Sequence, residues 1–194
     1  AYTRALSINP DYAEAYYNMG IVLREQGKLG EAVAAYTRAL SINPDFDIAY
    51  INFANALKGI IFTRPNNELL NTINKLLEKQ RIVRPSEICK TAISLLKLEP
   101  NLKSLFLLVE TNDVKKNPLT AITHLNKYPL LLTLMSICPI PDLDFEKLFK
   151  NIRASILTHV LSAKEVSSEV LRFQSVLALH CYTNEYIYNQ GKEE

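Results

Sequence analysis

Apolar residues recur along this chain at intervals of three and four, the spacing that places them on one face of an α-helix. The clearest case lies between Asn66 and Gln80, where the apolar stripe consists of Leu69, Leu70, Ile73, Leu76 and Leu77. Strand-like runs such as Ile60–Phe62 are too short to carry a sheet. The pattern therefore predicts an all-α chain.

Prolines and capping residues divide the chain after residue 63 into further helices. We expect helices from Ser86 to Pro100, over 101–109, in short pieces between 119 and 137, from Asp144 to Leu161, and from Ser167 or Ser168 to about 189. These segments share no common period. The sequence thus predicts an irregular helical linker domain at 63–194.

The first third of the chain repeats itself. Residues 1–11 and 35–45 both read AYTRALSINPD, at an offset of 34 residues. A fixed period of this size is typical of stacked helix-turn-helix repeats. One full repeat then occupies 13–46, with a partial repeat at 1–12 and a degenerate repeat at 47–62.

The full repeat carries residues suited to two closely packed helices. Its first helix presents Tyr16, Met19, Gly20 and Leu23, and its second helix presents Ala32, Tyr36 and Ala39. Gly20 and Ala32 are small because the helices are expected to cross there. Gly27 can adopt the left-handed conformation that ends a helix, and Pro44 stops the second helix.

The sequence also indicates where the helices start and where the repeat pattern ends. Asp11, three residues before Glu14, predicts a capping box for the first helix. Asp45 or Asp47 is expected to cap the next one. The repeat pattern then ends, because Lys58–Phe62 stands where a second helix is expected.

The pattern Y-x-x-M-G-x-x-L, then G, then E-A-x-x-x-Y-x-x-A-L-x-x-x-P closely resembles the tetratricopeptide repeat (TPR) family. The resemblance implies a TPR α-solenoid over 1–62, in which the first helix of each hairpin lines a concave surface. It also implies a protein-interaction scaffold whose groove holds an extended peptide or a partner helix.

The inward face of the two first helices supplies the candidate peptide-binding residues. They are Tyr17, Asn18, Ile21 and Arg24, followed 34 residues later by Ile51, Asn52, Asn55 and Lys58. An asparagine amide both donates and accepts, so it can pair with a peptide backbone of any sequence. Asn18 and Asn52 hold equivalent places, similar to the asparagine ladder of O-linked N-acetylglucosamine transferases. Arg24 and Lys58 can meet acidic groups.

An alternative for the same residues stays open. The asparagines can instead hydrogen-bond to neighbouring hairpins, and the two cations can simply be solvated. Tyr16, Tyr36 and Tyr50 are assigned to packing between hairpins rather than to binding.

Composition excludes several classes of partner. Lys and Arg total 22 against 20 Asp and Glu, a net charge of +2, which provides no electrostatic footprint for nucleic acid or for anionic membranes. The longest apolar run, Pro129–Cys138, is too short to span a bilayer. Cys89, Cys138 and Cys181 lack the spacing of a disulfide framework or zinc site, so we expect reduced thiols in a cytoplasmic protein.

We expect no catalytic, cofactor or metal site in these residues. The glycines form no phosphate-binding loop, and His124, His159 and His180 lack the spacing of metal ligands. His180 and Cys181 are adjacent, so on a helix they point about 100° apart. Glu185 is expected to be a solvated or capping carboxylate.

A second resemblance involves Ile82–Ser86, Ala92–Leu96 and Leu177–Tyr188, which ends in N-E-Y-I-Y. These segments look like the linker of bacterial TPR proteins fused to a class I S-adenosylmethionine-dependent methyltransferase. The resemblance implies a substrate-recruiting, non-catalytic arm whose catalytic domain lies beyond residue 194. A glycosyltransferase with TPR arms is a third hypothesis. Because the chain begins within a repeat, we expect it to be a piece of a longer protein.

Overall fold

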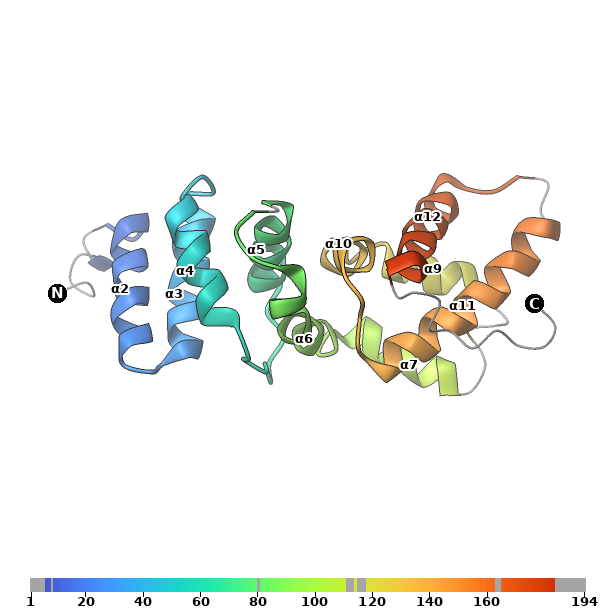
Figure 1. Cartoon of the computed structure of the whole chain (residues 1–194), viewed down its shortest axis with the longest axis horizontal. Coiled ribbons are helices and arrows are strands. Elements are labelled where there is room, and N and C mark those ends of the chain that lie inside the picture. Colours follow the sequence, from blue (N-terminus) through green and yellow to red (C-terminus); the bar gives the residue numbers. More distant parts are fainter. Residues whose placement is uncertain are drawn as a thin grey trace. The chain divides into compact units, whose positions relative to one another are not determined.

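The chain is described here from a computed structural model that covers residues 6–7, 9–79, 81–110, 114, 118–162 and 165–183. Regular structure in these ranges is entirely helical, which confirms the all-α prediction (Figure 1). The helices are α2 (Ala13–Glu25), α3 (Leu29–Ile42), α4 (Asp47–Leu57), α5 (Asn67–Glu78), α6 (Pro85–Leu96), α7 (Pro100–Glu110), α9 (Pro118–Leu125), α10 (Pro129–Ile137), α11 (Leu143–Ser162) and α12 (Ser168–Thr183).

Two compact units divide the chain, Ala1–Ala92 and Ile93–Glu194. The division falls within α6, later than the boundary at 62/63 that the end of the repeat pattern suggested. That earlier boundary marks where the sequence motif stops and remains a prediction about domain organisation. Each unit is described below by itself.

In the first unit, α2 and α3 form the helical hairpin expected for residues 13–46. Gly27 joins them with φ 76°, a left-handed conformation that favours glycine. A Cβ atom added to Gly20 would lie 2.5 Å from the ring of Tyr36, which is fully buried. The close crossing predicted from Gly20 is therefore present, and the tyrosine ring fills it.

The helix starts differ from the expected capping box at Asp11 and from the expected cap at Asp45 or Asp47. Tyr12 is the N-cap of α2 and Phe46 the N-cap of α4, and neither start has a side-chain capping bond. Each start is preceded by a turn in which an asparagine side chain bonds to the chain two residues on: Asn9 Oδ1 accepts from Asp11 N and Asn43 Oδ1 accepts from Asp45 N, each at 3.1 Å. These equivalent turns position the aspartates before the helices begin.

A second helix follows the degenerate repeat after all, displaced along the chain. Residues 58–66 form a non-helical connection, and α5 then starts with Asn66 accepting a capping bond from Leu69 N at 3.0 Å. The buried positions of α3 recur in α5 with a shift of 37 residues. The matching sets are Ala32, Val33, Ala35, Tyr36, Ala39 and Leu40, and Leu69, Leu70, Thr72, Ile73, Leu76 and Leu77.

The same comparison extends the repeat into α6. Its buried positions follow those of α4 with a shift of 39 residues: Ala49, Tyr50, Phe53, Ala54, Ala56 and Leu57 correspond to Ile88, Cys89, Ala92, Ile93, Leu95 and Leu96. The spacing of buried positions along the helix therefore recurs in α6, although the sequence motif has ended.

Polar contacts fasten α5 and the first part of α6 to α4. Lys79 Nζ lies 2.6 Å from Asp47 Oδ1 and 5.0 Å from the ring centroid of Tyr50. Thr91 Oγ1 donates to the carbonyl of Leu57 at 3.0 Å. These bonds therefore hold neighbouring segments at both ends of α4.

The second unit packs α7, α9, α10, α11 and α12 around an apolar core. Phe145 and Phe149 of α11 are fully buried, and Phe106 meets Phe145 edge-on with ring centroids 5.0 Å apart. Ser167 Oγ accepts from Val170 N at 3.4 Å, so a serine does start α12 as the sequence predicts.

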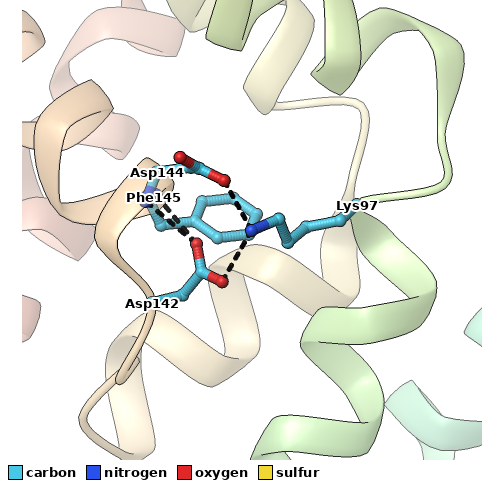
Figure 2. Close-up of polar contacts among 4 residues, drawn as sticks. All are labelled: Lys97, Asp142, Asp144 and Phe145. Carbon is cyan, nitrogen blue, oxygen red and sulfur yellow. Dashed lines mark hydrogen bonds and ion pairs between the residues drawn. The ribbon is translucent and has the colours of Figure 1, made fainter. Parts of the chain in front are cut away.

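Asp142 connects the start of α11 to the segment after α6 within this unit (Figure 2). Its Oδ1 atom accepts from the backbone N–H groups of Asp144 and Phe145, at 3.1 and 3.2 Å. Lys97 Nζ lies 2.8 Å from Asp142 Oδ2 and 2.5 Å from Asp144 Oδ2. Burial alone would lower the pKa of Lys97, but the two carboxylates more than offset it, so this pKa is raised.

Gly20→Ala is expected to destabilise the first unit by about 1–3 kcal/mol, because the added methyl group collides with a buried ring that has no free space. Chemical denaturation followed by circular dichroism measures the change. Gly30→Ala is the matched control, since no atom lies within 4 Å of its added Cβ and alanine favours the helix. Equal stability of the two variants would contradict the close crossing.

Substitutions of Asp142 separate its cap from its charge. Asp142→Asn keeps an oxygen for the helix start but loses the ion pair, whereas Asp142→Ala loses both. We expect the alanine variant to be about 1 kcal/mol less stable than the asparagine variant in urea unfolding. If both variants lose the same stability, the capping bonds contribute nothing.

Candidate functional site

The candidate residues on α2 and α4 meet in a hydrogen-bonded group of three side chains. Asn52 Nδ2 donates to the hydroxyl of Tyr17 at 2.8 Å, and Arg24 Nη1 donates to Asn52 Oδ1 at 2.9 Å. Tyr17 and Arg24 lie on α2, and Asn52 lies on α4 between them. We call these three residues the inner triad. It confirms that the helices expected to line one surface are neighbours.

The inner triad fixes which way the Asn52 amide points. Its oxygen faces the guanidinium of Arg24 and its nitrogen faces the phenol oxygen of Tyr17. An amide has two N–H donors and an oxygen with two lone pairs, so half of its capacity remains for another molecule. The Tyr17 hydroxyl accepts within the group and keeps its own proton for donation.

Tyr17 also packs against aromatic rings in the hairpin. Its ring centroid lies 4.9 Å from that of Phe46 and 6.0 Å from that of Tyr36. The phenol therefore has an apolar side that packs and a polar end that bonds to Asn52. Phe46 was not among the sequence candidates, because its contact with Tyr17 depends on the fold of the hairpin.

Asn18 behaves differently from its repeat equivalent Asn52. It is half-buried, and its side chain makes no hydrogen bond with any described residue. The partners of Asn52 come from the preceding first helix, α2. The alternative of bonding to a neighbouring hairpin therefore describes Asn52, whereas the Asn18 amide has its full capacity within the described chain.

The other candidate residues differ in how far they are exposed to solvent. Ile21 is half-buried, whereas Ile51, Asn55 and Lys58 are exposed. Lys58 Nζ lies 2.7 Å from Glu87 Oε2 of α6. This hydrogen bond lowers the pKa of the Glu87 carboxyl. Lys58 is thus paired rather than merely solvated, and its partner could not be found from the repeat because Glu87 lies beyond it.

Tyr36 and Tyr50 are almost completely buried, which confirms their assignment to packing. Burial raises the pKa of both phenols, with Arg24 opposing the shift at Tyr36 and Lys79 opposing it at Tyr50. Tyr16 is half-buried, with the guanidinium of Arg38 6.0 Å from its ring centroid. None of the three is needed to form the inner triad.

His180 lies in the core of the second unit rather than in a catalytic site. Its side chain is buried, its ring meets Phe149 edge-on at 5.2 Å, and it hydrogen-bonds to the backbone of Met135. Burial lowers its pKa to about 4, although the bond to Met135 opposes the shift. Burial also raises the pKa of the Cys181 thiol, against the influence of Arg153, so this pair has no activated thiolate.

The described residues bear on only some of the remaining predictions, which concern metal ligands, membrane spans and a methyltransferase linker. No three His, Cys, Asp or Glu side chains gather as metal ligands would in the described residues. No described helix has the length and apolarity needed to cross a bilayer. Asn184–Tyr188, which carries the methyltransferase resemblance, and Glu185 within it lie outside the described residues. The methyltransferase and glycosyltransferase hypotheses remain predictions.

Comparison with known families matches the hairpin. The family model described as tetratricopeptide repeat matches residues 13–46, the same bounds as the full repeat, which contains the α2–α3 hairpin. No curated protein matches the chain. Tetratricopeptide repeats generally mediate protein–protein interaction, and residues 13–46 match one such repeat.

Acid is expected to destabilise the second unit through His180. The unfolded imidazole has a pKa of 6.5 and the folded one about 4, so the unfolded state binds the proton more readily as the pH falls between these values. The folding free energy should weaken by about 1.4 kcal/mol per pH unit in this window. Urea unfolding at several pH values measures the slope.

His180→Gln supplies the control for this titration, because glutamine does not take up a proton. We expect its stability to change less than that of the wild type between pH 6.5 and 4. Parallel curves for the two proteins would show that His180 is not buried in its neutral form.

Proposed function

We propose that the first unit is a protein-interaction scaffold that holds an extended peptide or a partner helix along the surface formed by α2 and α4. The observation that supports this most strongly is the inner triad. Its bonds hold the Asn52 amide in one orientation while leaving part of its hydrogen-bonding capacity unused. A preorganised group loses less conformational freedom when a partner binds.

The inner triad offers more donors than acceptors. Arg24 uses one guanidinium nitrogen on Asn52, the Tyr17 hydroxyl retains its proton, and Asn52 retains one N–H. Backbone carbonyls and carboxylates of a guest chain are the acceptors that fit these donors. The Asn18 amide extends the row, because it has no hydrogen-bonding partner among the described residues.

Apolar side chains lie beside these polar groups. Ile51 is 48% exposed on α4, and Ile48, one turn before it, is 53% exposed. Such residues can receive the side chains of a guest, while the amides recognise its backbone. Ile48 was missed in the sequence because its counterpart in the first helix, Glu14, is charged.

The cations contribute unequally in this proposal. Arg24 is already aimed by its bond to Asn52, so it meets an acidic group at little cost in side-chain freedom. Lys58 must first leave Glu87, a partly exposed pair with 43% and 37% of the side chains accessible. Exposed ion pairs contribute about 0–1 kcal/mol, so Lys58 can exchange partners.

Peptides selected on the full chain from a displayed library of random 12-residue sequences test the proposal. We expect a class of these peptides to lose about tenfold or more in affinity for the double variant Asn18→Ala with Asn52→Ala, because two amide hydrogen bonds disappear. Fluorescence polarisation gives the affinity, and circular dichroism checks that helicity is unchanged.

Asn71→Ala is the matched control, since Asn71 is an exposed asparagine of α5 outside the inner surface. Its affinity for the same peptides should equal that of the wild type. The proposal is wrong if no selected peptide is weakened by the double variant, or if the control weakens them equally.

A further inference from the structure

The connection between α4 and α5 borders an open groove that is also lined by α3 and α5. The groove has a volume of about 430 Å³. Its wall is the segment 60–66, and its floor consists of Gly30, Val33, Ala34 and Thr37 of α3 with Leu69 of α5. The groove therefore involves α3 and α5, whereas the inner triad involves α2 and α4.

Small residues on α3 make the floor of the groove. Gly30 and Ala34 are one helical turn apart, so they lie on the same face, and both are exposed. A Cβ atom added to Gly30 would meet no atom within 4 Å. This contrasts with Gly20, where the missing side chain is replaced by the ring of Tyr36. The space above Gly30 is therefore not filled by packing within the described chain.

The extended connection explains why the groove exists at this place. The equivalent connection between α2 and α3 contains only residues 26–28, whereas that between α4 and α5 runs from 58 to 66. The longer segment brings apolar side chains to the groove. Among them Ile61 is 66% exposed, more than any other large apolar residue described in the first unit.

Charge indicates what kind of partner fits. Arg64 is the one ionisable side chain among the lining residues, and it forms no ion pair with the described residues. The carboxylates nearest in sequence, Glu31 and Glu68, are not part of the lining. A guest with an apolar side chain and a carboxylate would thus complement both the floor and the rim.

We propose that this groove is a second docking site, which receives a short segment of a partner protein. The segment places an apolar side chain over Gly30 and Ala34 and an aspartate or glutamate beside Arg64. The site is independent of the surface around the inner triad, because the two share no residue. Together they would let the first unit hold two partner segments at once.

Gly30→Leu blocks the groove without disturbing the fold, because the new side chain enters open space and leucine has a higher helix propensity than glycine. The test uses the full chain, a displayed library of random 12-residue peptides and counter-selection with Gly30→Leu. We expect peptides that combine Asp or Glu with Leu, Ile or Phe. Their affinity should fall at least tenfold on Gly30→Leu and about tenfold on Arg64→Gln.

Three controls make the result decisive. Gly30→Ala should leave most of the affinity, since a methyl group fills little of the groove. The variant Asn18→Ala with Asn52→Ala should leave these peptides unaffected, which separates this site from the proposed function. Thermal unfolding of Gly30→Leu should occur no lower than that of the wild type.

Two outcomes would overturn the proposal. One is a selection that yields no peptide weakened by Gly30→Leu and by Arg64→Gln. The other is wild-type self-association in sedimentation equilibrium that Gly30→Leu abolishes, which would mean that a second copy of this chain occupies the groove.

Discussion

The fold of the first unit depends on one close contact, in which α2 approaches α3 so tightly that Gly20 has no side chain and the ring of Tyr36 fills the space. Because helices at this separation must keep a fixed angle and register, the positions of their other faces follow. α4 packs on α3 and also contacts α2, which brings Asn52 to Tyr17 and Arg24 in the inner triad.

The repeat geometry persists after the residues that define it have changed. At the places equivalent to Gly20 and Tyr36, α4 has Ala54 and α5 has Ile73, a larger residue and a smaller one. Exchanges that keep the total volume are the best tolerated in a packed interior. The packing can therefore continue to α5, which contacts α3, although the sequence of α5 no longer resembles that of the first hairpin.

Sequence periodicity predicted the helices, the turn at Gly27 and the crossing at Gly20, because each depends on residues close in the chain. It failed for α5 as part of the repeat, since the longer connection after Leu57 changes the period from 34 to 37. It also failed for the caps of α2 and α4, because the N-caps of these helices are Tyr12 and Phe46, one residue after the aspartates Asp11 and Asp45.

The candidate site was predicted as a surface but not as a set of bonds. Helical spacing gives the face on which Tyr17, Arg24 and Asn52 lie, whereas their mutual bonds require the distance between α2 and α4. Likewise, the partner of Lys58 lies on α6, outside any repeat visible in the sequence. The difference between Asn18 and Asn52 arises from neighbours, which identical repeat positions do not reveal.

Nuclear Overhauser spectroscopy of the full chain tests most directly whether the helices stack in this register. The stacking predicts one cross peak between the Gly20 α-protons and the Tyr36 ring, and another between the Asn52 side-chain amide and the Tyr17 ring. If the first cross peak appears without the second, the hairpin folds but α4 does not stand beside α2, and the common binding surface does not exist.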